Sequence, residues 1–227
     1  MDVLNLAIQK GQKTLSEYDS KKLLAAYGIP ITREGLVRSA DEAASMAGEM
    51  GFPVVLKACS ADLLHKSDLG AVVLDLKNVT EVQEAYKRII DLIDHPLEGV
   101  LVQEMIKGPR ELVLGLSRDA QFGPCVMFGL GGVLTEIIND TVFRVAPLEM
   151  MDAQEMLLEL RAKAILEPFR GQAAADRQTI CRSLMAIGRI GLENEAVAEI
   201  DINPLIIGPD GRVKAVDALV ILKDAGK

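Results

Sequence analysis

The stretch AVAEIDINPLIIGPDGRVKAVDALVIL, residues 196–222, is typical of two β-strands joined by a tight turn. Its Pro-Asp-Gly segment is a common turn sequence, because proline fixes one backbone angle and glycine tolerates the left-handed region. Facing residues of an antiparallel hairpin have numbers with a constant sum. A turn centred on Asp210 makes that sum 420 and places Asn203 opposite Asp217, with Cβ atoms roughly 5 Å apart.

An amide oxygen and a carboxylate placed side by side can bind Mg²⁺, which typically takes one or two protein oxygens together with phosphates and waters. Asn203 and Asp217 are therefore candidate metal ligands. The competing interpretation is an incidental polar pair on a solvated sheet face. A register shifted by one residue would separate the two side chains, and the hairpin alone favours the simpler interpretation.

Helix and strand patterns alternate along the rest of the chain, which predicts an α/β protein. Ser39 and Glu42 form a capping-box pattern before a short helix, and Thr80 and Gln83 form a second one before a longer helix. Helical patterns cover residues 16–27, the two segments after these caps and most of 151–190. Strand patterns cover residues 31–37, 52–58, 71–76, 99–105, 110–116 and 123–130.

The order of these elements predicts two α+β lobes, a smaller one over residues 1–99, including the first helix, and a larger one over residues 100–227. Junctions and glycine-rich loops between lobes commonly bind ligands. At Gly131 and Gly132 in FGLGGVLTE, backbone N–H groups could approach a phosphate, although such a stretch is also typical of a plain turn. Neither a complete GxGxxG motif nor a Walker A motif is present.

Two side chains stand out by their setting. Lys57 interrupts the apolar strand VVLKA, and is either an edge lysine whose ammonium reaches water or a point charge for nucleotide phosphates. His65, in LLHKSDLGAV (63–72), is one of two histidines and lies among charges in a connection between predicted strands. It is either a solvated loop histidine or a metal ligand, general base or nucleophile, although only Asp62 and Asp68 flank it as further metal ligands. A nucleophilic role needs a neutral imidazole, which is mostly present near neutral pH.

Composition excludes several classes of protein. The net charge of −8, the 4% of aromatic residues and the lack of tryptophan disfavour nucleic-acid binding. No apolar stretch approaches the roughly 18 residues of a membrane span, and the N-terminus does not resemble a signal peptide, so we expect a cytoplasmic protein. Cys59, Cys125 and Cys181 share no metal-binding spacing and are expected to be reduced.

Several segments together resemble the ATP-grasp β subunit of ADP-forming acetyl-CoA synthetases, within the NDP-forming acyl-CoA synthetase family. This family is similar in fold to the β subunit of succinyl-CoA synthetase. The set is specific as an ordered whole, although no single member is. Between Leu15 and Leu222 it reads SEYDSKKLLAAYGIP, GFPVVLKA, HKSDLGAV, VLVQEMIKGPRELVLG, FGPCVMFGLGG and EIDINPLII.

The resemblance implies an ATP-grasp fold of two lobes with the nucleotide between them. It implies reversible conversion of acyl-CoA, ADP and phosphate to acid, CoA and ATP, with ATP/ADP and Mg²⁺ as ligands. Nothing in the 227 residues resembles a CoA site. The resemblance therefore also implies a CoA-binding α subunit or fused domain as partner, and hence a hetero-oligomer.

Residue roles carry over through the matching motifs. His65 of HKSD corresponds to the family's phosphohistidine, Lys57 to its phosphate-contacting lysine, and Asn203 and Asp217 to its metal ligands. Ala71 replaces the second glycine that usually follows HKSD in the family. The further implied nucleotide contacts are Gln103, Glu104 and Met105 near adenine and Glu111 near the ribose.

Two other functions fit the same residues. An ATP-grasp carboxylate–amine ligase makes an acyl phosphate directly and needs no histidine carrier. A nucleotide-sensing regulatory module would bind ADP without phosphoryl turnover. A stable phosphohistidine separates the synthetase subunit from the amine ligase, and turnover separates it from the sensor.

Overall fold

The computed structural model describes residues 3–61, 70–132 and 140–223, and the chain divides into two compact units. The larger unit comprises Met1–Leu15, Asp19–Ile31 and Ile106–Lys227, and the smaller unit comprises Ser16–Tyr18 and Thr32–Met105. Each unit has its own hydrophobic core.

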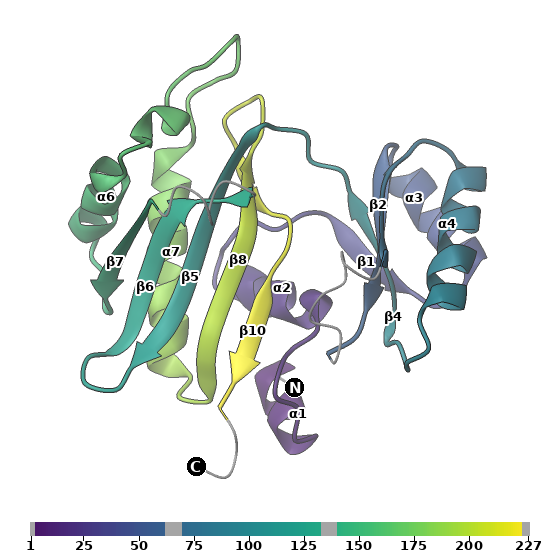
Figure 1. Ribbon diagram of the computed structural model, residues 1–227, viewed down its shortest axis with the longest axis horizontal. Helices are drawn as coiled ribbons and strands as arrows, with labels where there is room; N and C mark the ends of the chain where they lie inside the picture. Colours follow the sequence, from purple (N-terminus) through teal and green to yellow (C-terminus); the bar gives the residue numbers. More distant parts are fainter. Residues whose placement is uncertain (1–2, 62–69, 133–139, 224–227) are drawn as a thin grey trace. The chain divides into compact units, whose positions relative to one another are not determined.

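The smaller unit is built on a four-stranded antiparallel sheet (Figure 1). Its strands are β1 (Glu34–Val37), β4 (Gly99–Glu104), β2 (Val54–Cys59) and β3 (Val72–Leu76), in that spatial order. Helices α3 (Ala40–Met50) and α4 (Val79–Leu92) cover one face, where they share a core with alternate residues of β2 and β4. The expected lobe boundary at residue 99 differs from this division, because β4 pairs with β1 and β2.

Helix α3 begins with the predicted capping pattern. The backbone N–H of Glu42 donates to Oγ of Ser39 (3.2 Å), and Oε2 of Glu42 accepts from the backbone N–H of Arg38 (2.7 Å). The first bond satisfies an N–H group that a helix start leaves without a partner, and the second holds Arg38, the residue before the N-cap. The local sequence therefore specifies where this helix begins.

Helix α4 begins differently from the prediction. Its N-cap is Asn78, whose Oδ1 accepts from the backbone N–H of Glu81 (3.0 Å). The capping box predicted from Thr80 and Gln83 is wrong. Asn78 has the extended backbone of an N-cap and precedes Thr80, so the helix starts at Val79, before Thr80 is reached.

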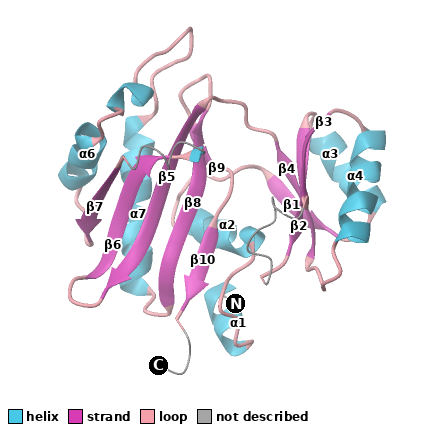
Figure 2. Cartoon of the chain, viewed as in Figure 1, coloured by secondary structure: helices cyan, strands magenta, loops and turns pink. Residues whose placement is uncertain are grey.

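The larger unit is built on a six-stranded antiparallel sheet (Figure 2). Along the sheet the order is β10 (Leu219–Leu222), β8 (Val197–Ile207), β5 (Arg110–Asp119), β6 (Gly123–Leu130) and β7 (Thr141–Val145), with β9 (Val213–Ala215) also paired to β8. In the described residues its α-helices are α1 (Val3–Gln9), α6 (Met150–Glu159), α7 (Arg177–Glu193) and α2 (Glu17–Ala26), whose first two residues belong to the smaller unit. A short 3-10 helix, η2 (Lys163–Leu166), lies between α6 and α7.

Helix α7 packs on one face of this sheet through an apolar stripe. Ile180, Leu184 and Ile187 are each fully buried and belong to the same core as Leu116 of β5 and Val126 of β6. Their spacing brings them to one side of the helix. The opposite face of the sheet is thereby left for polar side chains.

None of the helices in the described part of the chain is long and apolar enough to cross a bilayer.

Candidate functional site

The terminal hairpin has the predicted register. On both sides of Asn203 and Asp217 the paired residue numbers add to 420, and the backbone N–H of Val216 donates to the carbonyl of Pro204 (3.0 Å). Asn203 and Asp217 therefore lie opposite each other between the two paired regions. Those regions pair Leu205, Ile206 and Ile207 with Ala215, Lys214 and Val213, and Asp201, Ile200 and Glu199 with Leu219, Val220 and Ile221.

An irregularity in β8 explains why the Asn203 side chain lies outside the core and can bind a ligand. Ile200 and Ile202 point into the core, and so do Leu205 and Ile207, although strict alternation would send the second pair to the other face. The register with β5 shifts at the same place. Such bulges re-aim side chains, and here Asn203 is half-buried outside the core.

Three further predicted residues lie around Asn203. Its Oδ1 accepts from the backbone N–H of Gly132 (3.2 Å), and the backbone N–H of Gly131 donates to the carbonyl of Glu111 (2.9 Å). A Cβ on Gly131 would collide with the backbone of Leu112, and one on Gly132 with the Glu111 carboxylate. Only glycine permits this close approach, which brings Glu111, Gly131, Gly132 and Asn203 together.

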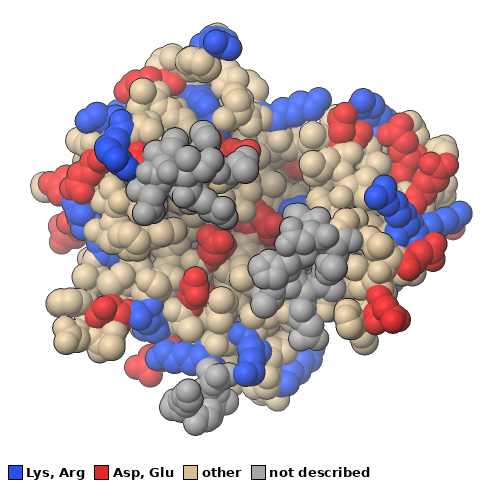
Figure 3. Space-filling model, in the orientation of Figure 1, with Lys and Arg blue, Asp and Glu red and all other residues tan. Residues whose placement is uncertain are grey.

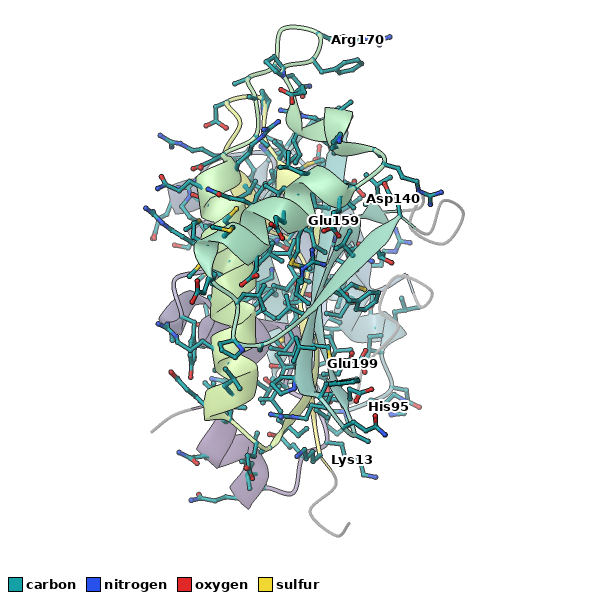
Figure 4. All side chains as sticks on the ribbon, turned by 90° about the vertical axis from the view of Figure 1, so that its left-hand side faces the viewer. Lys13, His95, Asp140, Glu159, Arg170 and Glu199 are labelled. Atoms are coloured by element: carbon teal, nitrogen blue, oxygen red, sulfur yellow. The ribbon has the colours of Figure 1, made fainter. Side chains whose placement is uncertain are left out.

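An acidic residue that the sequence analysis did not single out lies beside the pair. Burial, and then the nearby charges of Glu199 and Asp217, raise the pKa of Asp201 to about 6. Glu199, Asp201 and Asn203 alternate along β8, and this spacing is the signal that could have identified Asp201 (Figure 4 labels Glu199). Acidic side chains are visible on the sheet face that α7 leaves open (Figure 3).

This donor set fits Mg²⁺. Burial is the main cause of the raised pKa of Asp201, and a divalent cation beside Asp217 would offset the carboxylate repulsion that adds to it. Among the described residues, no group of three or more His, Cys, Asp and Glu side chains could hold a metal by itself. An asparagine oxygen, one carboxylate and substrate phosphates are a common alternative set for Mg²⁺.

Lys57 lies in the smaller unit, on the interior strand β2. Its side chain is nearly buried, and its Nζ lies 2.7 Å from Oε1 of Glu17, which is also buried. The interpretation of Lys57 as an edge lysine reaching water is therefore wrong, because β2 has neighbours on both sides. Glu17 is a second residue that the sequence analysis missed, since nothing local links it to a lysine 40 positions away.

Gln103 shares a sheet face with Lys57. In the register of β2 and β4, Val55 pairs with Gln103 and Lys57 with Leu101, so these four side chains point away from α3 and α4. The Gln103 amide donates to Oγ1 of Thr32 (2.9 Å) and is fully buried. Gln103 thus ties the end of β4 to the segment before β1.

Glu104 and Met105 complete the predicted interlobe segment. The Glu104 carboxylate accepts from the backbone N–H of Arg33 (2.7 Å) and from its Nε (3.1 Å). The backbone N–H of Met105 donates to the carbonyl of Pro53 (3.4 Å). Both residues therefore help to fix the strand end, and their contact with adenine stays a prediction.

His65 lies outside the described residues, which resume at Gly70. Its predicted role as phosphoryl carrier is therefore not tested by the geometry. Residues 133–139 also lie outside the described part of the chain.

Comparison with known proteins places the chain in a family. A family model described as an ATP-grasp domain matches residues 6–222. The β subunit of ADP-forming acetate–CoA ligase I from Pyrococcus furiosus is 40% identical over 215 residues, which cover 92% of each chain. This chain belongs to the ATP-grasp family of ADP-forming acetate–CoA ligase β subunits. The resemblance and the fold class inferred from the sequence are thereby confirmed.

Solved structures of the family superpose closely on the chain. One is an acetyl-coenzyme A synthetase 1 of Ca. Korarchaeum cryptofilum with coenzyme A, Ca-AMPCP and HgCl+ (46% identity, TM-score 0.93, 98% of this chain and 99% of that chain). A second structure of that enzyme, with coenzyme A and Mg-AMPPCP, is described as having its phosphohistidine segment pointing towards the nucleotide binding site (45% identity, TM-score 0.86, the same coverage).

The ATP-grasp part also occurs within longer proteins of this family. Acetate–CoA ligase I of Archaeoglobus fulgidus is 36% identical over 215 residues, which make up 92% of this chain but 31% of that protein. A β subunit of this family is thus one part of a larger enzyme, built either from separate subunits or as a fusion.

Proposed function

We propose that this chain binds the nucleotide in an ADP-forming acyl-CoA synthetase, with acetyl-CoA as the acyl-CoA. In the direction of ATP synthesis, the whole enzyme converts acyl-CoA, ADP and phosphate to acid, CoA and ATP. The observation that carries the proposal is the pairing of Asn203 with Asp217, beside Gly132 and Glu111, in a chain of this family.

The phosphoryl carrier in this proposal is His65. A ring nitrogen of His65 attacks the phosphorus of an acyl phosphate, the P–O bond to the acyl group breaks, and the acid leaves. An oxygen of the ADP β-phosphate then attacks the same phosphorus, the P–N bond breaks, and ATP forms. The HKSD motif and the phosphohistidine segment named for the Korarchaeum enzyme support this assignment.

The chain's other residues position the nucleotide. Asn203 and Asp217 would hold Mg²⁺, which neutralises phosphate charge during the transfer. Phosphoryl transfer depends mainly on positioning and charge, so the proposal assigns a phosphate contact to the Lys57 ammonium. It places Gly131 and Gly132 at the nucleotide, where the lack of a side chain lets the phosphates approach the backbone. It assigns the ribose to Glu111 and the adenine to the segment Gln103, Glu104 and Met105.

The proposed partner is a CoA-binding α subunit, or a fused domain of the same kind, which makes the working enzyme a hetero-oligomer. It would supply the acyl phosphate, since this chain's sequence contains nothing that resembles a CoA site. We also propose a cytoplasmic location, which fits Cys59, Cys125 and Cys181, since none of these three cysteines is in a disulfide.

The substitution Asp217→Asn tests the metal assignment. We expect it to weaken ADP binding in the presence of Mg²⁺ by about tenfold or more, which corresponds to a loss of about 1.4 kcal/mol. The melting temperature should stay near that of the wild type, because Asp217 lies outside the core. Two titrations with ADP, one in the presence of Mg²⁺ and one in the presence of EDTA, measure the change in ADP affinity directly.

Asp210→Asn is the matched control, since it makes the same change in the same hairpin but at the exposed turn. It should leave both titrations unchanged. An unaltered, Mg²⁺-dependent ADP affinity in Asp217→Asn would remove the metal assignment. ADP binding by the wild type without any phosphoryl turnover, even with the partner present, would instead favour the sensing module.

A further inference from the structure

Glu17 and Lys57 form a buried ion pair in the smaller unit. Oε1 of Glu17 and Nζ of Lys57 are 2.7 Å apart, and the two side chains are 1% and 6% exposed. Glu17 is the first residue of α2, and Lys57 is central in β2, a strand buried along its whole length. By contrast, the ion pair between Arg33 and Glu104 in the same unit reaches solvent, since the Arg33 side chain is 63% exposed.

A charged lysine in such a strand needs a counter-ion. Burial in apolar surroundings favours the neutral amine over the ammonium, and a neutral amine attracts phosphate far less. A carboxylate at hydrogen-bonding distance reverses that preference through a charge-assisted hydrogen bond. Exposed pairs such as Arg33 with Glu104 contribute little, but removal of one partner of a buried pair is costly.

The ion pair also fixes where the ammonium lies. A lysine side chain is long and flexible, and its charge is concentrated on the terminal ammonium. The position of that ammonium therefore depends on the group that binds it. Glu17 is anchored at the start of a helix and is almost inaccessible to solvent. An ammonium has three N–H donors, so a bond to Glu17 and bonds to phosphate oxygens are compatible.

We propose that Glu17 is a positioning residue for Lys57, which keeps its ammonium charged and directed for the phosphates of the nucleotide. The inference rests on the proposed function, since it needs Lys57 to contact phosphate. Glu17 itself does not touch the nucleotide in this account. A purely structural ion pair would stabilise the unit without affecting how phosphate is bound.

The test compares two ligands that differ only in their phosphates. The dissociation constants of ADP, with Mg²⁺ present, and of adenosine are measured for the wild type and for Glu17→Gln. We expect the ratio of the ADP to the adenosine constant to rise by about 10- to 100-fold, as when outer partners of metal ligands are removed. A structural role would change both constants alike, or only the melting temperature.

A double-mutant cycle with Lys57→Met locates the effect. The ratio should be high in Lys57→Met, and adding Glu17→Gln should raise it no further, because the group that Glu17 positions is then absent. Glu42→Gln, which removes one negative charge from a capping residue of the same unit, should leave the ratio at the wild-type value.

The outcomes separate this inference from the proposed function. An unchanged or lowered ratio in Glu17→Gln, or an effect that persists in the Lys57→Met background, overturns the positioning role. Failure of the wild type to bind ADP, or an unchanged ratio in Lys57→Met, overturns the proposed function instead. Should Glu17→Gln not fold, Glu17→Asp decides, since it keeps the charge but shortens the side chain: a severalfold rise supports the role, and no rise overturns it.

Discussion

Asp140 is a buried carboxylate just before β7 in the larger unit, and it binds the segment that follows α6 (Figure 4 labels Asp140). Its Oδ2 accepts from the backbone N–H of Ala162 (2.8 Å), and its Oδ1 from the backbone N–H (3.1 Å) and Nε (3.4 Å) of Arg161. Burial raises its pKa, but these donors and the Arg161 charge outweigh burial and lower the pKa below the ordinary value.

We therefore predict that Asp140→Asn lowers the free energy of unfolding at pH 7 by roughly 1.5–3 kcal/mol, the range for hydrogen bonds to a charged group. Because the folded-state pKa is lowered, this stabilisation is present above the unfolded pKa of about 3.9 and is lost as the pH falls through the folded value. Urea unfolding at several pH values measures it. Asp91→Asn, an exposed change on α4, is the control. A difference that persists undiminished well below pH 4 would contradict the argument.

At the scale of the element, the two candidate caps of α4 make opposite predictions. Asn78→Ala should lower the free energy of unfolding by about 1 kcal/mol, because Oδ1 of Asn78 accepts the backbone N–H of Glu81. Thr80→Ala, at an exposed position inside the helix, should change it by no more than about 0.5 kcal/mol. The reverse order of these two values in urea unfolding would restore the capping box predicted from the sequence.

Among the helices and strands, the sequence predicts those features that neighbouring residues determine. The hairpin register follows from the position of its own turn, so Asn203 opposite Asp217 was predictable. The stripe of α7 follows from its spacing. The predicted N-cap of α4 is wrong because two capping patterns, one starting at Asn78 and one at Thr80, overlap two residues apart. Only the position at which the folded chain enters the helix distinguishes them.

The rest depends on contacts between distant segments. Glu17 and Lys57 are 40 positions apart, and their pairing requires the start of α2 to lie against β2. The raised pKa of Asp201 depends first on burial and then on the charges of Glu199 and Asp217, and only the folded sheet buries Asp201 and brings Asp217 near it. No local pattern carries either fact, although the alternation of Glu199, Asp201 and Asn203 was visible.

For the whole molecule, we predict that the isolated chain does not convert acetyl-CoA, ADP and phosphate to acetate, CoA and ATP. The proposed acyl phosphate forms on the partner, and this chain would act only on its phosphoryl group. ATP formation is measured with the chain alone and after addition of the CoA-binding partner. Robust turnover by the chain alone, with contamination by the partner excluded, would show that the CoA site has been misplaced.

Labelling the phosphoryl group on the protein tests directly whether His65 is its carrier. The chain is incubated with Mg²⁺ and γ-³²P-labelled ATP, and the protein-bound label is then treated with acid and with base. We expect an acid-labile, base-stable label. His65→Asn should remove this label and also the turnover measured with the partner, while the ADP affinity stays within a few-fold of the wild type. His95→Asn should change none of these. A label and turnover that both survive in His65→Asn would contradict the carrier mechanism and favour the carboxylate–amine ligase.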